Sequence, residues 1–146
     1  MNKIWQLAHK LRNRGGVYKM ISKLFEYLNY IVYSNHIPAE IQIGINTKFE
    51  HHGLGCVVHE KATIGSDCRI FQNVTIGAKW PEKNSKDGVP KIGNKVQIGC
   101  GAVVLGNISI GNNVYIGANS VVLNDVPDNS IAVGVPARII NRNHIW

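Results

Sequence analysis

The sequence lacks the features that stabilise small secreted proteins. It has only three cysteines, Cys56, Cys68 and Cys100, which are odd in number, widely spaced and without a C-x-x-C pair. This pattern disfavours a disulfide framework and a zinc knuckle, and it indicates free thiols in a reducing compartment. We therefore expect a cytoplasmic protein without a bound metal.

Long apolar runs are also missing. No segment approaches the roughly 18 uninterrupted apolar residues of a membrane-spanning helix. Basic residues between Lys10 and Lys23 break the apolar positions near the N-terminus, which is unlike the apolar core of a signal peptide. The chain is predicted neither to span a membrane nor to be exported by a signal peptide.

Acidic residues are scarce, because nine Asp and Glu stand against 16 Lys and Arg, which gives a net charge of +7. A basic surface suits nucleic acid, anionic lipid or a polyanionic cofactor, and it equally serves solubility. Because no nucleic-acid-binding motif accompanies the charge, we expect no nucleic-acid partner. The length of 146 residues and the apolar content of 45% fit one folded domain.

The first part of the chain follows a helical period. Apolar residues recur three or four positions apart from Ile4 to about Tyr33, and Gly15-Gly16 interrupts them, which predicts two helices whose aromatic residues pack. Pro38 ends this pattern. We expect a helical segment over residues 1–36, the main domain over 37–140 and a tail over 141–146.

Beyond Pro38, aliphatic residues recur every six positions. The in-phase residues are Val58, Ile64, Ile70, Ile76, Ile92, Ile98, Val104, Ile110, Ile116 and Val122. Six is the period of neither a helix nor a strand, and repetition of this length is typical of a parallel β-helix, in which three hexapeptides form one triangular coil. Glycine follows many of these residues, and it would relieve corners where a side chain would clash or φ must turn positive. The predicted fold class is an all-β solenoid.

The six-residue period is lost in two places, where a solenoid must loop outward. The first lies between Phe49 and Val58 and contains two adjacent histidines, His51 and His52, beside glycines. A histidine at a distorted corner suits acid and base chemistry, because its ordinary pKa is about 6.5. One ring nitrogen must then be held by a carboxylate or a carbonyl, and the candidate carboxylates nearby are those of Glu50, Glu60 and Asp67.

The second interruption runs over residues 78–90 and predicts an extruded loop that carries Lys79 and Trp80.

Several motifs flank the two interruptions. They are Ile37-Pro38-Ala39-Glu40, His52-Gly53-Leu54-Gly55-Cys56-Val57-Val58, Gln72-Asn73-Val74-Thr75-Ile76-Gly77, Leu105-Gly106-Asn107-Ile108 and Ala132-Val133-Gly134-Val135-Pro136-Ala137-Arg138-Ile139. In these motifs, residues from about Ile37 to Ile140 resemble the hexapeptide acyltransferases, and among them the serine-acetyltransferase-like branch.

The resemblance implies a left-handed parallel β-helix that forms a homotrimer, with acetyl-CoA bound in the groove between neighbouring prisms. It implies that His52 is the catalytic base and that Asn73 lines the same face. From their positions beside His52, Glu50 and His51 are expected to support it. The positions that match the acetyl-CoA site are Gly77, Ala78, Lys91, Cys100, Ala118 and Arg138. Lys91 and Arg138 carry the positive charge that would meet the phosphates.

Two departures from the serine branch bear on the acceptor. Serine enzymes carry Asp-His where this chain has His51-His52, and Arg-His where it has Gly88-Val89. These differences favour a sugar hydroxyl, which Trp80 and Lys79 would meet. The predicted function is O-acetylation of a sugar or polysaccharide precursor, closest to the capsule and exopolysaccharide enzymes. Serine O-acetylation in cysteine biosynthesis is the alternative.

The basic N-terminal helices have two expected positions. Lipid-linked acceptors would bring these helices to the inner face of the membrane, or the helices would pack on a neighbouring subunit.

Two rivals from other classes stay open, namely a metal-binding β-helix and a non-catalytic scaffold. His51, His52, His59 and Glu60 lie close together in the sequence, but adjacent residues of an extended chain point to opposite faces and do not easily share one ion. No histidine lies between His59 and His144, which weighs against a three-histidine zinc site. A scaffold would show no binding of CoA.

Overall fold

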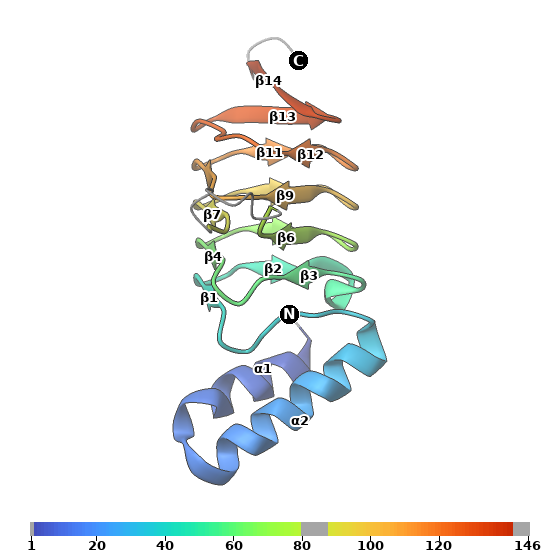
Figure 1. Ribbon diagram of the computed structural model, residues 1–146, viewed down its shortest axis with the longest axis vertical. Coiled ribbons are helices and arrows are strands. Elements are labelled where there is room, and N and C mark those ends of the chain that lie inside the picture. Colours follow the sequence, from blue (N-terminus) through green and yellow to red (C-terminus); the bar gives the residue numbers. More distant parts are fainter. Residues whose placement is uncertain (1, 80–87, 142–146) are drawn as a thin grey trace.

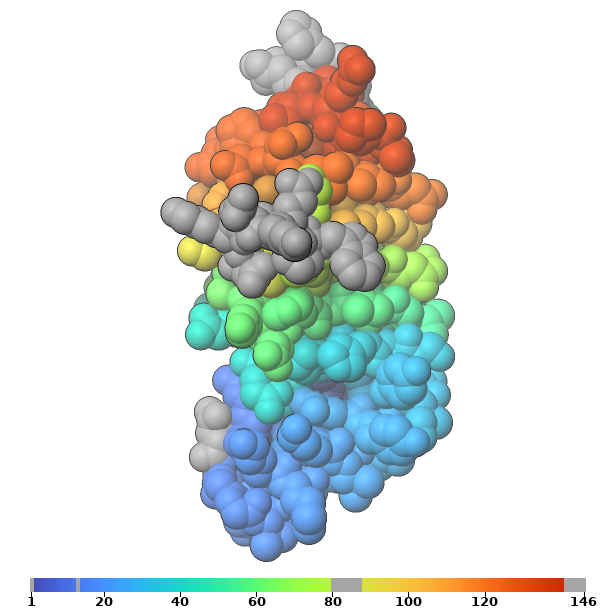
Figure 2. Space-filling model, in the orientation of Figure 1, coloured from blue at the N-terminus to red at the C-terminus, as the bar shows by residue number. Residues whose placement is uncertain are grey.

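In the computed structural model, which describes residues 2–79 and 88–141, two helices lie across one end of an elongated prism of short strands (Figure 1). The helical part consists of α1 (Lys3–Leu11), a 3-10 turn (Arg12–Arg14) and α2 (Gly16–Tyr33). The strands β13 and β14 lie at the opposite end of the prism (Figure 1). In the space-filling view, the two helices form a continuous surface at the end of the prism (Figure 2).

Among the described residues, the strands form three sheets, which we name sheets I, II and III. Sheet I contains β1 (Gln42–Ile43), β4 (Thr63–Ile64), β7 (Lys91–Ile92) and β10 (Ser109–Ile110). Sheet II contains β2 (Lys48–Phe49), β5 (Arg69–Ile70), β8 (Gln97–Ile98), β11 (Tyr115–Ile116), β13 (Ser130–Gly134) and β14 (Ala137–Asn141). Sheet III contains β3 (Val57–Val58), β6 (Thr75–Gly77), β9 (Val103–Leu105) and β12 (Val121–Val122).

The chain visits the three sheets in turn, so each circuit adds one coil to the stack. Neighbouring strands pair in parallel, except for the antiparallel pair of β13 and β14. The ladder aligns equivalent residues, such as Ile70, Ile98 and Ile116 in sheet II. The prediction of a parallel β-helix is therefore confirmed.

The core of the prism is the set of aliphatic side chains that recur every six residues. Each of the ten in-phase residues is at most 4% exposed. Burial of stacked aliphatic side chains is the main stabilising contribution in such a fold. The six-residue period therefore located the core of the prism correctly.

The repeat glycines have a different role from the asparagines at the corners. A Cβ atom on Gly65 would lie 2.4 Å from the carbonyl oxygen of Gly93 in the next coil, and one on Gly99 would lie 2.5 Å from the backbone nitrogen of Ala118. These glycines are therefore needed for close approach of the coils. Left-handed backbone is taken instead mainly by polar residues, which adopt it at lower cost than other non-glycine residues. Those at the corners of the prism are Asn46, Asp67, Asn73, Lys95, Asn113, Asn119 and Asn129.

Helix α1 closes the end of the prism through Trp5. This side chain is buried and belongs to the same apolar cluster as the coils. Its indole Nε1 donates a hydrogen bond of 2.8 Å to the carbonyl oxygen of Ile37. The ring of His9 stacks on Trp5 with centroids 4.6 Å apart, which fixes α1 against the first coil.

Helix α2 has an orientation that the apolar period did not predict. The residues that recur at helical spacing, such as Met20 and Leu24, are exposed, and the opposite side carries Ser22, Glu26 and Asn29. Tyr27 and Tyr30 are also exposed, so the expectation that the aromatic residues pack is wrong for these two. The reason is that the inner side of this helix meets polar partners on α1 and on the segment that leads into the prism.

The stacked core can be tested at its centre. Ile98→Ala is expected to lower the free energy of unfolding by about 2–5 kcal/mol, because the alanine leaves a cavity where a fully buried side chain stacked between Ile70 and Ile116. Gln97→Ala in the same strand is the control, with an expected change below about 1 kcal/mol. Chemical unfolding followed by circular dichroism measures both. Equal losses would contradict the inward stacking of Ile98.

The cysteines provide a second test. Cys56 and Cys68 are buried, and burial raises the pKa of both thiols, whereas Cys100 is partly exposed. A thiol reagent should therefore modify Cys100 in the folded protein and reach the other two only after unfolding. Peptide mass spectrometry after timed labelling reports the order. Modification of Cys56 at the same rate as Cys100 would show that the prism opens near its first coils.

Candidate active site

The adjacent histidines lie in a tight turn between sheets II and III. This 3-10 turn, η2 (Glu50–Gly53), connects β2 to β3 and contains left-handed backbone at His51, with φ of 49°, and at His52, with φ of 62°. Such backbone is costly for residues other than glycine, so the surroundings must hold it in place. The first interruption of the six-residue period therefore corresponds to a tight, left-handed turn at one corner of the prism.

Three buried asparagines hold this turn from the helical end. Asn2 Nδ2 donates to the carbonyl oxygen of His52 at 3.0 Å, and Asn35 Nδ2 donates to the same oxygen at 3.3 Å. Asn29 Nδ2 in α2 donates to Asn35 Oδ1 at 2.6 Å. Because a carbonyl that accepts two amide donors is strongly positioned, the backbone of His52 is tied to both helices.

The two histidine side chains diverge from the turn. The His52 ring lies beside Tyr33, at the end of α2, with ring centroids 5.2 Å apart and planes inclined at 31°. The His51 ring lies toward Phe71, with centroids 6.5 Å apart. Both histidines are exposed, so either ring is accessible for proton transfer.

The carboxylates considered as holders of the imidazole have other neighbours. Glu50 Oε1 accepts a hydrogen bond of 2.8 Å from Arg69 Nε, and the guanidinium of Arg69 lies 5.5 Å from the centre of the Phe71 ring. Asp67 Oδ1 accepts from Asn46 Nδ2 at 3.1 Å. The turn is thus bordered by Phe71 and by an ion pair that joins its first residue to β5.

Three of the predicted site residues stack at the same corner above His52. The backbone N–H of Asn73 donates to Leu54 in the turn, Gly101 donates to Gln72, and Asn119 donates to Cys100. The same corner of successive coils is therefore stacked along the prism. Asn73, Cys100 and Ala118 form a column over the histidine turn, with about 4.8 Å between neighbouring coils. The structure brings this part of the predicted site together.

Close packing at the base of this column explains one glycine. Gly55 has φ of 65°, and a Cβ atom on it would lie 2.0 Å from Asn73 Oδ1. The side chain of Asn73 therefore rests on the backbone of the histidine turn, where only glycine leaves it room.

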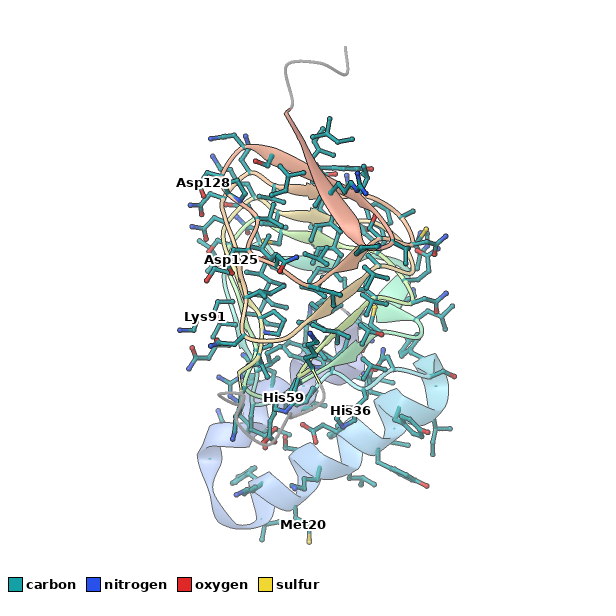
Figure 3. All side chains as sticks on the ribbon, turned by 45° about the horizontal axis from the view of Figure 1, so that its top comes forward. Met20, His36, His59, Lys91, Asp125 and Asp128 are labelled. Carbon is teal, nitrogen blue, oxygen red and sulfur yellow. The ribbon has the colours of Figure 1, made fainter. Side chains whose placement is uncertain are left out.

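The other predicted residues lie elsewhere on the chain. Gly77 ends β6 and Ala78 follows it, at the opposite edge of sheet III from His52. Lys91 begins β7 in sheet I, and its side chain points away from the flank of the prism (Figure 3). Arg138 lies in β14 at the far end, beside a cavity of about 260 Å³. One chain alone does not gather these residues around His52.

Two predicted features lie partly beyond the described residues. Of the loop over 78–90, residues 80–87 are outside the described range, and so is Trp80, the residue chosen for a sugar acceptor. Lys79, its neighbour, is described and exposed. Of the tail over 141–146, residues 142–146 also lie outside.

A second group of residues lines a cavity of about 300 Å³ on sheet III. It includes His36, His59, Glu60 and Gly77, and Figure 3 shows His36 and His59 close together. Across the described ranges, no three His, Cys, Asp or Glu side chains are placed to hold a metal ion. This cavity adjoins β6, which lies between the Asn73 corner and Gly77.

Sequence reasoning missed the residues that hold and surround the turn. Tyr33, Asn35 and Arg69 contact the histidine turn, but none of them belongs to a motif at the spacing of the repeat. Asn35 is close to Pro38, where the helical pattern ends, and that position is the one available signal. Asn2 lies 50 residues from His52, and no local pattern connects them.

Comparison with known proteins identifies the family. Residues 90–124 match the model described as "Bacterial transferase hexapeptide (six repeats)". A serine acetyltransferase of Synechococcus elongatus is 40% identical over 126 residues, which are 86% of this chain and 50% of that protein. One of Staphylococcus aureus is 38% identical over 149 aligned positions, which cover 99% of this chain and 67% of that protein. A solved serine acetyltransferase in complex with CoA has 37% identity and a TM-score of 0.78, over 94% of this chain and 54% of that one.

These relatives contradict the expectation of a sugar acceptor, because they carry the name serine acetyltransferase over most of this chain. That expectation rested on the Asp and the Arg-His pair that this chain lacks, and it overlooked the charged pair of Glu50 and Arg69 that borders the histidine turn. The chain spans half the length of the cyanobacterial relative and about two thirds of the staphylococcal one. With these identities and this coverage, the chain belongs to the hexapeptide-repeat transferases, in the family that includes the serine acetyltransferases.

Proposed function

We propose that this protein is a serine O-acetyltransferase, which transfers the acetyl group of acetyl-CoA to the hydroxyl of L-serine. His52 is the general base, and the enzyme is a cytoplasmic homotrimer of left-handed β-helices. Residues 37–140 form the transferase domain and residues 1–36 form its helical segment. The names of the relatives and the CoA-bound neighbour support this assignment.

The observation that carries the proposal is the placement of His52. Its imidazole is exposed at a prism corner, its backbone is held by Asn2 and Asn35, and its ring lies beside Tyr33. A base with an accessible ring nitrogen and a fixed backbone is what proton abstraction from a hydroxyl requires.

The reaction is a direct transfer. His52 removes the proton from the serine hydroxyl as its oxygen attacks the thioester carbonyl carbon, and the carbon–sulfur bond then breaks. The imidazolium returns the proton to the departing thiolate, so O-acetylserine and CoA leave and the imidazole is regenerated. The buried thiols of Cys56 and Cys68, whose pKa values are raised by burial, have no part in this sequence.

Acetyl-CoA would lie along the column above His52, past Asn73, Cys100 and Ala118. The column spans about 15 Å over three coil spacings, a length suited to an extended pantetheine arm. Gly77 and Ala78 lie at the opposite edge of sheet III and Lys91 begins β7 in sheet I, and in a trimer a neighbouring subunit would bring these residues to the column. Arg138 and Lys91 would supply positive charge for the phosphates.

Serine presents an ammonium and a carboxylate close to its hydroxyl, so the acceptor site needs both signs of charge. Glu50 begins the histidine turn and pairs with Arg69 at 2.8 Å, where the guanidinium is about half exposed. We assign the serine carboxylate to Arg69 and its ammonium to Glu50. These residues would take the place of the Arg-His and Asp side chains that the family pattern has and this chain lacks.

The role of His52 leads to a direct comparison with its neighbour. His52→Ala should lower kcat for L-serine acetylation by about 100- to 10,000-fold, the contribution of a general base. His51→Ala is the comparison and should lower kcat much less, because its ring lies toward Phe71 and Arg69, where its loss would affect the KM for L-serine instead. Release of CoA, followed with a thiol reagent, measures both, and equal melting temperatures establish that the variants fold. Unchanged turnover of His52→Ala would overturn the assignment, and saturable activity on simple sugars without activity on L-serine would exclude the acceptor.

The proposed serine contacts have a separate kinetic signature. Arg69→Ala should raise the KM for L-serine about tenfold or more and leave the KM for acetyl-CoA nearly unchanged, because it removes a charge-assisted contact to the acceptor alone. Lys48→Ala, an exposed basic residue of the adjacent strand β2, is the control. Equal effects of Arg69→Ala on both KM values would contradict its assignment to the acceptor.

A further inference from the structure

The outer face of α2 is an apolar stripe at the end of the molecule. Met20, Leu24, Tyr27 and Ile31 recur at helical spacing, and their exposed fractions lie between 56% and 70%. Figure 3 shows Met20 pointing away from the strands of the prism. A contiguous stripe of this kind on a globular protein marks a surface that binds a partner.

The opposite face of α2 excludes a simple rotation that would bury the stripe. Ser22 Oγ donates to the carbonyl oxygen of Ala8 at 2.8 Å, and Glu26 Oε1 accepts from the backbone N–H of Ala39 at 2.5 Å. Asn29 donates to Asn35, which in turn holds His52. Turning the apolar residues inward would break the hydrogen bonds of Ser22, Glu26 and Asn29, so the stripe is fixed toward the outside.

Charge distinguishes between partners for this face. Residues 1–36 contain six basic residues and one acidic residue, so they hold +5 of the net charge of +7. The acidic residue is Glu26, which is turned toward Ala39 on the other side of α2, where it interacts with Lys23 and with the exposed Glu40. A second copy of the same face would bring like charges together, whereas a negatively charged surface would be attracted.

The arrangement of the basic residues matches a flat surface. At 100° per residue, Lys19 and Lys23 follow one edge of the stripe, and both are exposed. Lysines beside an apolar stripe can extend their ammonium groups to phosphate while their stems stay with the apolar residues. The tyrosines Tyr27 and Tyr30 lie at the same edge, and such amphipathic rings favour the boundary between lipid and water.

We propose that α2 docks on an anionic lipid bilayer, with its apolar stripe among the lipid chains and with Lys19 and Lys23 at the headgroups. None of the described helices is long and apolar enough to cross a membrane, so the contact is peripheral. The long axis of the prism would stand away from the lipid surface, because the stripe is at its helical end (Figures 1 and 3). This proposal does not depend on the acyl-transfer reaction.

Vesicle sedimentation with the full chain tests the proposal. Wild-type protein should bind vesicles of phosphatidylcholine and phosphatidylglycerol and should bind pure phosphatidylcholine at least tenfold more weakly. Met20→Asp/Leu24→Asp and Lys19→Glu/Lys23→Glu should each weaken binding to the anionic vesicles at least tenfold, and added salt should weaken binding of the wild type. Turnover of L-serine should stay unchanged in these variants, which separates lipid binding from the proposed function.

Matched control variants place the same changes on the prism. Ile45→Asp/Val135→Asp exchanges two exposed apolar residues, and Lys61→Glu/Lys95→Glu exchanges two exposed lysines. Both controls should bind anionic vesicles within about twofold of the wild type. Equal losses in the α2 variants and the controls, or no binding by the wild type, would overturn the proposal. Self-association without lipid that Met20→Asp/Leu24→Asp abolishes, seen by sedimentation velocity, would assign the face to a second copy instead.

Discussion

The structure depends on one constraint, which is that every coil must pair in register with the coil below it. The parallel ladder joins Ile70 to Ile98 and Ile98 to Ile116, and their side chains fill the prism at the same level of each face. Because a slip by one residue would turn these side chains outward, the register is strongly fixed. Changes of length are tolerated only at corners, where the chain leaves the ladder. Both interruptions of the repeat are therefore found between strands.

The same constraint fixes the geometry of the candidate active site at one corner of the prism. Once the coils are in register, equivalent corners form columns, so a turn in one coil has a fixed relation to those above it. The turn at His52 departs from the regular corner by taking left-handed backbone at two successive histidines. Its carbonyl is held by Asn2 and Asn35, so the helical end and the first coil support the base together. The same contacts link the geometry at His52 to the packing of α1 and α2.

The sequence was sufficient for the fold and for part of the site. The six-residue period located the core, and the loss of phase located the histidine turn. Asn73, Cys100 and Ala118 were expected at the site only from the family resemblance, and the structure places them at one corner. The sequence did not show whether a repeat glycine is needed for close approach of the coils or for left-handed backbone, because both conditions favour glycine. Structure shows that Gly65 and Gly99 allow contact between coils and that asparagines take most of the left-handed corners.

One expectation, that of a sugar acceptor, failed for an identifiable reason. The acceptor was inferred from side chains that this chain lacks, whereas the charged pair that borders the histidine turn is formed by Glu50 and by Arg69, which lies 19 residues further along the chain, on another coil. The positions of Lys91 and Arg138 relative to His52 depend on how prisms associate, and no pattern within one chain contains that information. Long-range contacts such as that of Asn2 with His52 leave no periodic signal in the sequence.

The unusual orientation of α2 follows from the open end of the prism. The first coil has no coil beneath it, so its backbone groups need other partners, as the ends of solenoids generally do. Trp5 donates to the carbonyl of Ile37, Arg12 donates to the carbonyl of Ala39, and Glu26 accepts from the N–H of Ala39. Helix α1 covers this end with the buried Trp5, whereas α2 turns Glu26 toward Ala39 and Ser22 toward the backbone of α1. With its polar side chains engaged in this way, α2 leaves its apolar residues on the outside.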